Sequence, residues 1–157
     1  MHVNLPPLGW NTWNTFGPNI NEKIIMEAAD AMVEKGFLDA GYEYLVIDDC
    51  WALKQRDPVT RRLVADPEKF PNGMKAVADY VHSKGLKFGM YSCAGVRTCG
   101  DYPGSFDHEF IDAETFAEFG IDFLKYDYCY RSSSTAGPIL YHRMANALRA
   151  TGRDIVF

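Results

Sequence analysis

The sequence predicts an α/β fold in which successive βα units build a parallel sheet. Three observations support this prediction. Short apolar segments that end in polar residues recur at 8–13, 44–49, 86–92 and 121–127. Helical patterns fill the intervals between these segments, which are of similar length. The segment 44–47 is apolar almost throughout, which is typical of strands that are covered on both faces.

The helices between these strands have recognisable ends. Asn21 is placed to cap the first, and Gly36 lies just past its end. Asn72 and Gly85 mark the same two points of the second. The third and fourth helices are predicted at 110–119 and 138–150, each followed by a glycine, and a further strand begins at 154–157. About four and a half βα units fit into the chain, whereas a closed eight-fold barrel takes about 250 residues, so these patterns allow an open sheet or part of a barrel.

Composition excludes several classes of function. The chain has 16 Lys and Arg against 21 Asp and Glu, a formal net charge of −5, so we expect no nucleic-acid partner. It has no apolar run of about 18 residues and no charged-then-apolar leader, so we expect neither a membrane span nor a signal peptide. No histidine or cysteine pair has metal-ligand spacing and no glycine-rich phosphate loop is present, so we expect no metal and no cofactor.

Two long connections predict where a ligand binds. Residues 50–71 and 93–109 each follow the carboxyl end of a predicted strand, and both are longer than the usual βα loop of about 2 to 6 residues. Since α/β folds bind their ligands at this edge of the sheet, we expect the site there.

Aromatic and acidic side chains gather at the same strand ends and favour a sugar as the ligand. Carboxylates accept hydrogen bonds from hydroxyl groups, and indole rings cover the C–H face of a sugar ring. A single acid at a strand end is more often a turn or cap residue, but two adjacent buried acids are costly without a role. The candidates are Trp10, Trp13, Asp48, Asp49, Trp51, Tyr91, Lys125 and Asp127.

Asp127 is the strongest candidate for a reactive group. Lys125 and Asp127 stand two residues apart, on the same face of one predicted strand. A neighbouring ammonium favours the ionised carboxylate and keeps it available as a nucleophile. The spacing alone is equally compatible with a structural ion pair at the rim of the sheet.

Motifs along the whole chain resemble those of the retaining α-galactosidases of glycoside hydrolase family 27. They are LGWNTW at 8–13, DAGYEY at 39–44, IDDCW at 47–51, DPEKFPNG at 66–73, HSKGLKFGMY at 82–91, TC at 98–99, PGS at 103–105 and LKYDYC at 124–129. The resemblance implies a (β/α)8 TIM barrel, of which residues 1–157 are the amino-terminal half with the first four to five βα units.

The same resemblance assigns roles to individual residues. Asp127 matches the catalytic nucleophile and Lys125 a ligand of sugar hydroxyls. Trp13, Asp48 and Asp49 match residues that hold the 4- and 6-hydroxyls of galactose, and Tyr91 matches a tyrosine beside the nucleophile. Cys99 and Cys129 match a disulfide of the family. Cys50 and Cys93 are expected to be free thiols, which favours a bacterial cytoplasmic location over secretion, although a disulfide points the other way.

The implied activity is cleavage of terminal α-linked galactose by double displacement through a covalent galactosyl-enzyme. The second carboxyl that this mechanism needs lies on a later strand in the family, and we expect it beyond Phe157. The loop that distinguishes a 2-hydroxyl from a 2-acetamido group lies there too, so related α-N-acetylgalactosaminidase or β-L-arabinopyranosidase specificities stay open.

Two hypotheses from other classes remain. A non-catalytic half barrel would bind galactose without hydrolysing it. A receiver-type signalling domain would use the acid pair at 48 and 49 to bind magnesium, although receivers carry that pair on their first strand. If the chain folds alone, the uncovered sheet edges of a half barrel predict a homodimer.

Overall fold

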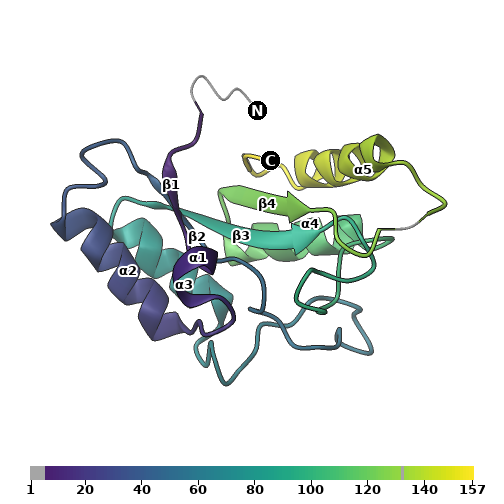
Figure 1. Ribbon diagram of the computed structural model, residues 1–157, viewed down its shortest axis with the longest axis horizontal. Helices are drawn as coiled ribbons and strands as arrows, with labels where there is room; N and C mark the ends of the chain where they lie inside the picture. Colours follow the sequence, from purple (N-terminus) through teal and green to yellow (C-terminus); the bar gives the residue numbers. More distant parts are fainter. Residues whose placement is uncertain (1–5, 132) are drawn as a thin grey trace.

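The computed structural model describes residues 6–131 and 133–157. Within these residues, four parallel strands form one sheet in the order β1-β2-β3-β4 (Figure 1). The strands are β1 (Gly9–Asn11), β2 (Tyr44–Val46), β3 (Lys87–Cys93) and β4 (Phe123–Asp127). The predicted α/β fold of successive βα units is confirmed.

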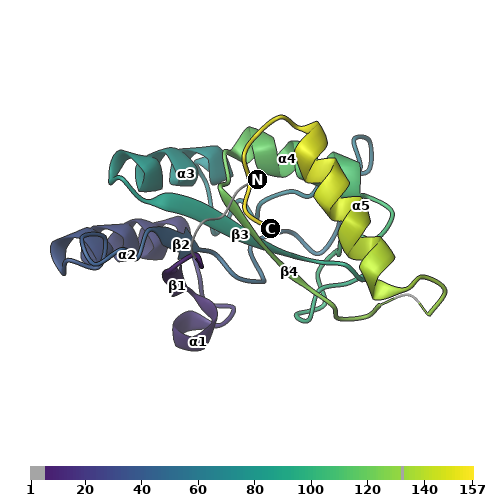
Figure 2. The ribbon, with the colours of Figure 1, turned by 90° about the horizontal axis from the view of Figure 1, so that it is seen from above.

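The long helices form a layer that follows the order of the strands. Each contacts the next along the chain, from α2 through α3 and α4 to α5, and Figure 2 shows this succession along the sheet. A short helix, α1, stands apart, next to the end of β1. The helices are α1 (Trp13–Phe16), α2 (Glu22–Glu34), α3 (Gly73–Ser83), α4 (Glu109–Phe119) and α5 (Gly137–Ala150).

The core fills the space between the sheet and this helical layer. Leu45 of β2 pairs in register with Phe88 of β3, and Met90 of β3 pairs with Leu124 of β4. All four side chains are buried, and buried residues of α2, α3 and α4 belong to the same cluster. Burial of this apolar surface is the main source of stability and sets which strand residues face the helices.

The predicted helix ends are largely confirmed. Asn21 Oδ1 accepts a hydrogen bond of 2.9 Å from the Ile24 amide, which satisfies a free N–H group at the start of α2. Asn72 does precede α3, but its side chain makes no cap. Its Nδ2 instead donates to Glu22 Oε1 at 2.8 Å, so this residue joins α3 to α2.

Four predicted strands are shorter than expected. β4 begins at Phe123, two residues later than predicted. β1 ends at Asn11, and Trp13 begins α1 because the Trp13 amide donates to Asn11 Oδ1 at 2.9 Å and turns the chain. β2 ends at Val46, so Asp48 and Asp49 lie in the bend that follows it. The segment 154–157 pairs with β4 at a single bridge, Phe123 with Val156.

A buried ion pair joins the two long connections to α4. Arg56, in the connection between β2 and α3, forms two hydrogen bonds to Asp112 of α4, at 2.6 and 2.7 Å. The same guanidinium donates to the carbonyl of Gly104, in the connection between β3 and α4, at 2.7 Å. The Asp112 side chain has no exposed surface and that of Arg56 only 8%. The loops above the sheet are therefore held to the helical layer.

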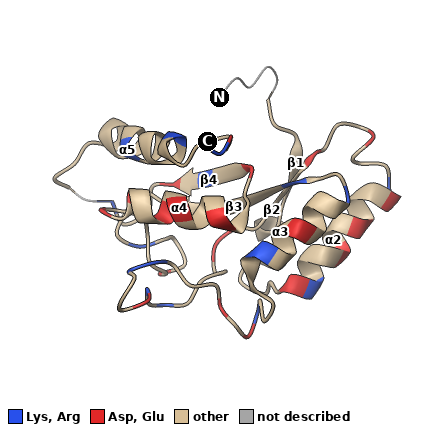
Figure 3. Cartoon of the chain, turned by 180° about the vertical axis from the view of Figure 1, so that it is seen from behind, with Lys and Arg blue, Asp and Glu red and all other residues tan. Residues whose placement is uncertain are grey.

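Charged residues are unevenly distributed among the helices. α4 carries acidic residues and no Lys or Arg, as Figure 3 shows, whereas α2 carries both signs. Among the acids of α4, Asp112 forms an ion pair with Arg56, and Glu118 pairs with Arg62 at the surface. Within the described residues, none of the helices combines the length and apolar character that crossing a bilayer requires.

Candidate functional site

The candidate site lies where the carboxyl ends of β2, β3 and β4 meet. The register places Tyr91 opposite Lys125 and Cys93 opposite Asp127, so the ends of β3 and β4 stand side by side. Within β4, Lys125 and Asp127 are partly exposed while Leu124 and Tyr126 are buried on the other face. The predicted shared face of Lys125 and Asp127 is confirmed.

Asp48 is the centre of an ion pair with Lys125. Its Oδ2 accepts a hydrogen bond of 2.7 Å from Lys125 Nζ, and its Oδ1 accepts one of 2.9 Å from the Asp49 amide. The Asp48 amide in turn donates to Thr12 Oγ1 at 3.0 Å, which ties the bend to the end of β1. The Asp48 side chain is buried and that of Lys125 is 38% exposed. The ammonium therefore presents remaining N–H groups to solvent at the rim.

Asp49 is fixed by two backbone amides. Oδ1 accepts from the Cys50 amide and Oδ2 from the Gly100 amide, both at 2.7 Å. Cys50 has φ 71°, a left-handed conformation that non-glycine residues rarely adopt, so the chain turns sharply directly after Asp49. A Cβ on Gly100 would lie 2.9 Å from Asp49 Oδ2, so this close approach requires glycine.

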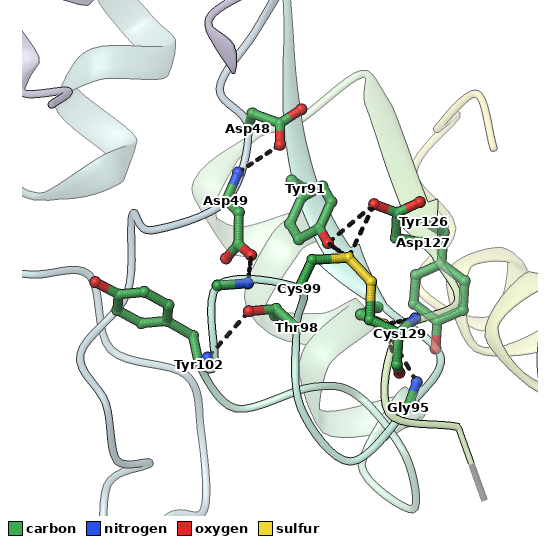
Figure 4. Close-up of a disulfide and its surroundings, with 12 residues drawn as sticks. Asp48, Asp49, Tyr91, Gly95, Thr98, Cys99, Tyr102, Tyr126, Asp127 and Cys129 are labelled. Atoms are coloured by element: carbon green, nitrogen blue, oxygen red, sulfur yellow. Dashed lines mark hydrogen bonds between the residues drawn. A yellow bond between two sulfur atoms is a disulfide. The ribbon is translucent and has the colours of Figure 1, made fainter. Parts of the chain in front are cut away.

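Tyr91 supports the partly exposed carboxylate of Asp127. Its hydroxyl donates to Asp127 Oδ2 at 3.1 Å (Figure 4). Trp51 Nε1 donates to the Tyr91 carbonyl at 2.9 Å and fixes this part of β3. Burial, and then the charges of Asp49 and Asp127, raise the pKa of Tyr91. The phenol therefore stays protonated and remains a donor to Asp127 over the physiological pH range.

A disulfide borders the same carboxylate oxygen of Asp127. Cys99, in the connection after β3, is bonded to Cys129, just beyond β4, with Cα atoms 5.3 Å apart. Cys99 Sγ lies 3.6 Å from Asp127 Oδ2 and 3.5 Å from the Tyr91 hydroxyl (Figure 4). The disulfide implied by the family resemblance is thus present, and it attaches the connection after β3 to the end of β4.

Cys50 and Cys93 are free and buried, as expected. Burial raises the pKa of both thiols, and the charge of Asp49 adds to the effect at Cys50. A raised pKa favours the protonated thiol, whereas the thiolate is the reactive form. Neither cysteine is therefore activated as a nucleophile.

The tryptophans have different positions. Trp13 is 40% exposed in α1 and is not part of the contacts that join the other candidate residues. Trp51 is buried and packs edge-on against Phe116 and Phe119, so it belongs to the core. Trp10 is partly buried and packs edge-on against Phe16.

The partner of Lys125 could not be identified from the spacing of residues in the sequence. That spacing suggests a partnership between Lys125 and Asp127, but the ammonium forms its ion pair with Asp48, which follows the end of β2. Asp127 is contacted by Tyr91 and Cys99 instead. Lys125 of β4 can reach Asp48 across the end of the sheet because Asp48 lies in the bend just beyond β2.

Sequence reasoning missed Thr12, Gly95 and Gly100 as residues that shape the site. Thr12 is fully buried and accepts from the Asp48 amide. A Cβ on Gly95 would lie 1.8 Å from the Cys129 carbonyl oxygen, so the backbone at Gly95 packs directly against the backbone at Cys129. The available signal was the presence of glycines inside a long connection, which often marks such close approaches.

The arrangement suits covalent chemistry at one carboxylate. Asp127 is partly exposed, accepts a hydrogen bond from a neutral phenol and is bordered by a rigid disulfide. Both oxygens of Asp48 and of Asp49 already accept N–H donors. Each of those oxygens keeps a further lone pair for a ligand hydroxyl, so the two buried acids suit binding and Asp127 suits bond formation.

Comparisons with known proteins agree with this arrangement. The family model described as "Alpha galactosidase A" matches residues 5–157. Alpha-galactosidase mel1 of Schizosaccharomyces pombe is 49% identical over 156 residues, which cover 97% of this chain and 36% of the yeast protein. The chain thus spans little more than a third of that relative.

Solved structures share the fold. Alpha-galactosidase I of Mortierella vinacea is 47% identical with a TM-score of 0.91, over 96% of this chain and 38% of that one. A β-L-arabinopyranosidase of Geobacillus stearothermophilus is 24% identical with a TM-score of 0.79, over 96% of this chain and 47% of that one. The second likeness concerns the fold alone. Together with the parallel sheet, the first identifies the fold as the amino-terminal portion of a (β/α)8 barrel.

Proposed function

Because the chain belongs to the α-galactosidase family of glycoside hydrolases, family 27, we propose that it supplies the nucleophile half of a retaining α-galactosidase. The reaction is cleavage of terminal α-linked galactose from oligosaccharides or glycoconjugates. Residues 1–157 are then the amino-terminal half of the catalytic barrel. The observation that supports this most strongly is the partly exposed Asp127 carboxylate at the end of β4, contacted by Tyr91 and the Cys99–Cys129 disulfide.

In this proposal Asp127 attacks the anomeric carbon of galactose. A retaining glycosidase forms a covalent glycosyl-enzyme on one carboxylate, and water then releases the sugar. The Tyr91 hydroxyl donates to Oδ2 and leaves Oδ1 free to form the bond. The disulfide at 3.6 Å limits rotation of the carboxylate, which favours a single attacking geometry.

Asp48, Asp49 and Lys125 bind sugar hydroxyls in the same proposal. The carboxylates accept hydrogen bonds from hydroxyl protons, and Lys125 Nζ donates to a hydroxyl oxygen while it keeps its bond to Asp48. The exposed indole of Trp13 is available to cover the apolar face of the ring. Charge-assisted bonds of this kind discriminate galactose from sugars that differ at one hydroxyl.

The second carboxyl that completes the reaction is proposed to lie outside residues 1–157. It must protonate the leaving oxygen and then deprotonate water, at about 5 Å from the nucleophile. Asp48 and Asp49 are poorly suited to this role because N–H donors occupy both oxygens of each. The chain by itself is therefore expected to bind galactose and to form the covalent bond without efficient turnover of ordinary galactosides.

A binding measurement tests the sugar site. The chain should bind galactose and not glucose in isothermal titration, and Asp49→Ala should weaken galactose binding by about 10- to 100-fold, since a charge-assisted hydrogen bond contributes about 1.5–3 kcal/mol. Glu43→Ala is the matched control because Glu43 pairs with Lys87 at the opposite end of the sheet. Equal binding of both sugars, or an unchanged dissociation constant in Asp49→Ala, would refute the site.

Two alternatives make different predictions. A non-catalytic galactose-binding half barrel is compatible with the N–H donors that occupy both oxygens of Asp48 and of Asp49, and it predicts binding with no covalent product. Related specificity for N-acetylgalactosamine or L-arabinopyranose predicts tighter binding of those sugars than of galactose. The receiver-type hypothesis is set aside because the family match covers residues 5–157.

The proposed partners follow from the same site. The substrate is a galactoside, and no nucleic-acid partner is proposed, given a net charge of −5. A homo-oligomer is proposed for the chain on its own, from the apolar surface beside β1.

A further inference from the structure

We propose that Cys99, Cys129 and Asp127 form a binding site for a thiophilic divalent cation such as Zn²⁺ when the disulfide is reduced. One sulfur from each cysteine and one carboxylate oxygen of Asp127 lie within 4.8 Å of one another. Thiolate sulfur with carboxylate oxygen is a donor set that zinc accepts. The proposed metal site depends on this geometry and not on the proposed galactosidase activity.

The distances suit zinc after a small movement. Zn–S bonds of about 2.3 Å and Zn–O bonds of about 2.0–2.2 Å in a tetrahedron place the ligand atoms about 3.5–3.8 Å apart. Cys99 Sγ and Asp127 Oδ2 are already 3.6 Å apart. The two cysteine Cα atoms, at 5.3 Å, allow the sulfurs to separate by side-chain rotation alone. The two sulfurs must separate from bonded contact to the edge of the tetrahedron, and Cys129 Sγ, which lies within 4.8 Å of the Asp127 oxygen, moves in the same rotation.

The backbone around both cysteines is held by hydrogen bonds that do not involve the disulfide. The Cys129 amide donates to Cys93 Sγ at 3.1 Å, and the Ala94 amide donates to the Asp127 carbonyl at 2.8 Å. On the other side of the site, the Gly100 amide donates to Asp49 Oδ2 at 2.7 Å. Reduction breaks one S–S bond and leaves these contacts in place, so the three ligand groups stay together.

The site is accessible from solvent. Cys99 is exposed, and Asp127 and Cys129 are partly exposed, so a cation can enter from solvent. Three protein ligands leave the fourth tetrahedral position to water, as in open zinc sites. The Tyr91 hydroxyl, 3.1 Å from Asp127 Oδ2, would act as the outer hydrogen-bond partner that orients the carboxylate ligand.

The chemical steps balance with a dithiol as the reductant. The Cys99–Cys129 disulfide takes up two electrons and two protons, and the dithiol loses them and becomes a cyclic disulfide. Zinc then displaces the two thiol protons and binds two thiolates and the ionised carboxylate. A small-molecule disulfide reverses the process: it takes up the two electrons and leaves as two thiols, and the re-formed Cys99–Cys129 bond releases the metal.

Metal binding has a consequence for the reaction, and this part rests on the proposed function. A cation bound to Asp127 Oδ2 withdraws electron density from the carboxylate that attacks galactose and so weakens it as a nucleophile. The reduced, metal-bound chain should therefore form no galactosyl adduct, whereas the oxidised chain should. The disulfide would then protect the nucleophile from metals.

A cadmium titration tests the site directly. Cd²⁺ is the probe, because its bonds to thiolates give an ultraviolet charge-transfer absorbance. The chain is reduced with dithiothreitol, freed of reductant without oxygen and titrated beside the oxidised chain. The oxidised chain is the matched control, since Cys50 and Cys93 are free in both. We expect one equivalent of Cd²⁺ on the reduced chain, with the thiolate absorbance, and none on the oxidised chain; Zn²⁺ should displace it.

Variants show whether the named residues are the ligands. Cys99→Ser should abolish the cadmium absorbance, and Asp127→Asn should weaken binding by at least the 10- to 100-fold that loss of an outer-shell partner costs. Equal cadmium binding by the reduced and oxidised chains would overturn the proposal, as would undiminished binding by either variant. Loss of the near-ultraviolet circular dichroism on reduction, without recovery on adding Cd²⁺, would also overturn it.

The metal site and the proposed function can fail separately. Cadmium binding with an unchanged rate of adduct formation would contradict the consequence for the reaction and leave the site intact. Absence of adduct in the oxidised chain, together with cadmium binding in the reduced chain, would contradict the proposed function alone.

Discussion

Single residues at the site are positioned mainly by backbone amides and by glycines. Asp49 accepts from the amides of Cys50 and Gly100, and the Asp48 amide donates to Thr12. These bonds are made before any sugar arrives, so binding would not require the two acids to reorganise. Preorganisation of this kind lowers the entropy cost of binding a small polar ligand.

The glycines of the connection after β3 provide a prediction at this scale. Gly100→Ala puts a Cβ against the movable carboxylate of Asp49, so it should reduce galactose affinity several-fold and the free energy of unfolding by no more than about 1–3 kcal/mol. Gly95→Ala overlaps the backbone carbonyl of Cys129, which cannot yield, and should destabilise the chain more. Urea denaturation and titration with galactose measure both, and equal stability of the two variants would contradict the assignment.

The sequence predicts which residues belong to the site more readily than it predicts which of them contact one another. The acid pair at 48 and 49 and the shared face of Lys125 and Asp127 follow from adjacency and from the strand period. The pairing of Lys125 with Asp48 does not, because it depends on where β2 ends relative to β4. The family resemblance supplied the disulfide, which no spacing rule could assign among four cysteines.

At the scale of elements, the site depends on how the two long connections are attached to α4. Arg56 reaches Asp112 of α4 and the carbonyl of Gly104 with one guanidinium, so a single side chain fixes both connections. The acidic character of α4 makes this possible. The loops then keep Asp49 and Cys99 in position above the sheet.

Loss of the buried ion pair should be far more costly than loss of an exposed one. Arg56→Ala leaves Asp112 buried without its partner, and we expect a loss of about 3–5 kcal/mol in the free energy of unfolding. Arg62→Ala is the control, because Arg62 pairs with the exposed Glu118 of the same helix and should cost at most about 1 kcal/mol. Urea denaturation of both variants measures this difference. A loss below about 1 kcal/mol in the free energy of unfolding for Arg56→Ala would show that other contacts hold the loops.

Element types were predictable from the sequence and element ends less so. The helices after Asn21 and Asn72 begin where predicted, and Gly36 and Gly85 follow their ends in left-handed conformations. The side chain of Asn72 bonds to Glu22 instead of capping, because a neighbouring helix competes for it. The turn at Trp13 was missed because it depends on a side-chain acceptor, Asn11, that looks like part of a strand.

At the scale of the whole molecule, the sheet has an open edge at β1. A largely apolar groove of about 510 Å³ lies beside it, lined by residues of β1, α2 and the segment after α2. Phe37 and Tyr42 line this groove with their rings 6.0 Å apart, and they are 46% and 39% exposed. Apolar surface of this extent is usually covered in a stable protein.

The groove predicts the behaviour of the chain in solution. We expect a dimer in light scattering, and Phe37→Glu should convert it to a monomer, because a charge in the buried interface is costly. Val59→Glu is the control, since Val59 is 87% exposed in a connection away from the groove. A monodisperse monomer of the unaltered chain would contradict the prediction.

The choice between an open sheet and part of a barrel could not be made from periodicity. Four parallel strands with a helix after each satisfy both architectures. The motifs of the whole chain made the distinction through their resemblance to one family, and the likeness to solved α-galactosidases confirmed it. Local patterns encode the βα unit, whereas the closure of a barrel depends on strand number and stagger.

The central claim is that Asp127 is the nucleophile, and α-galactosyl fluoride tests it most directly. Fluoride leaves without protonation, so the first step needs no general acid. Because we propose that the acid/base carboxyl lies outside residues 1–157, the covalent product should accumulate. Peptide mass spectrometry should find galactose attached to Asp127, no adduct in Asp127→Asn, and none with α-glucosyl fluoride. A folded chain that binds galactose yet forms no adduct, or forms it on another residue, would contradict the assignment.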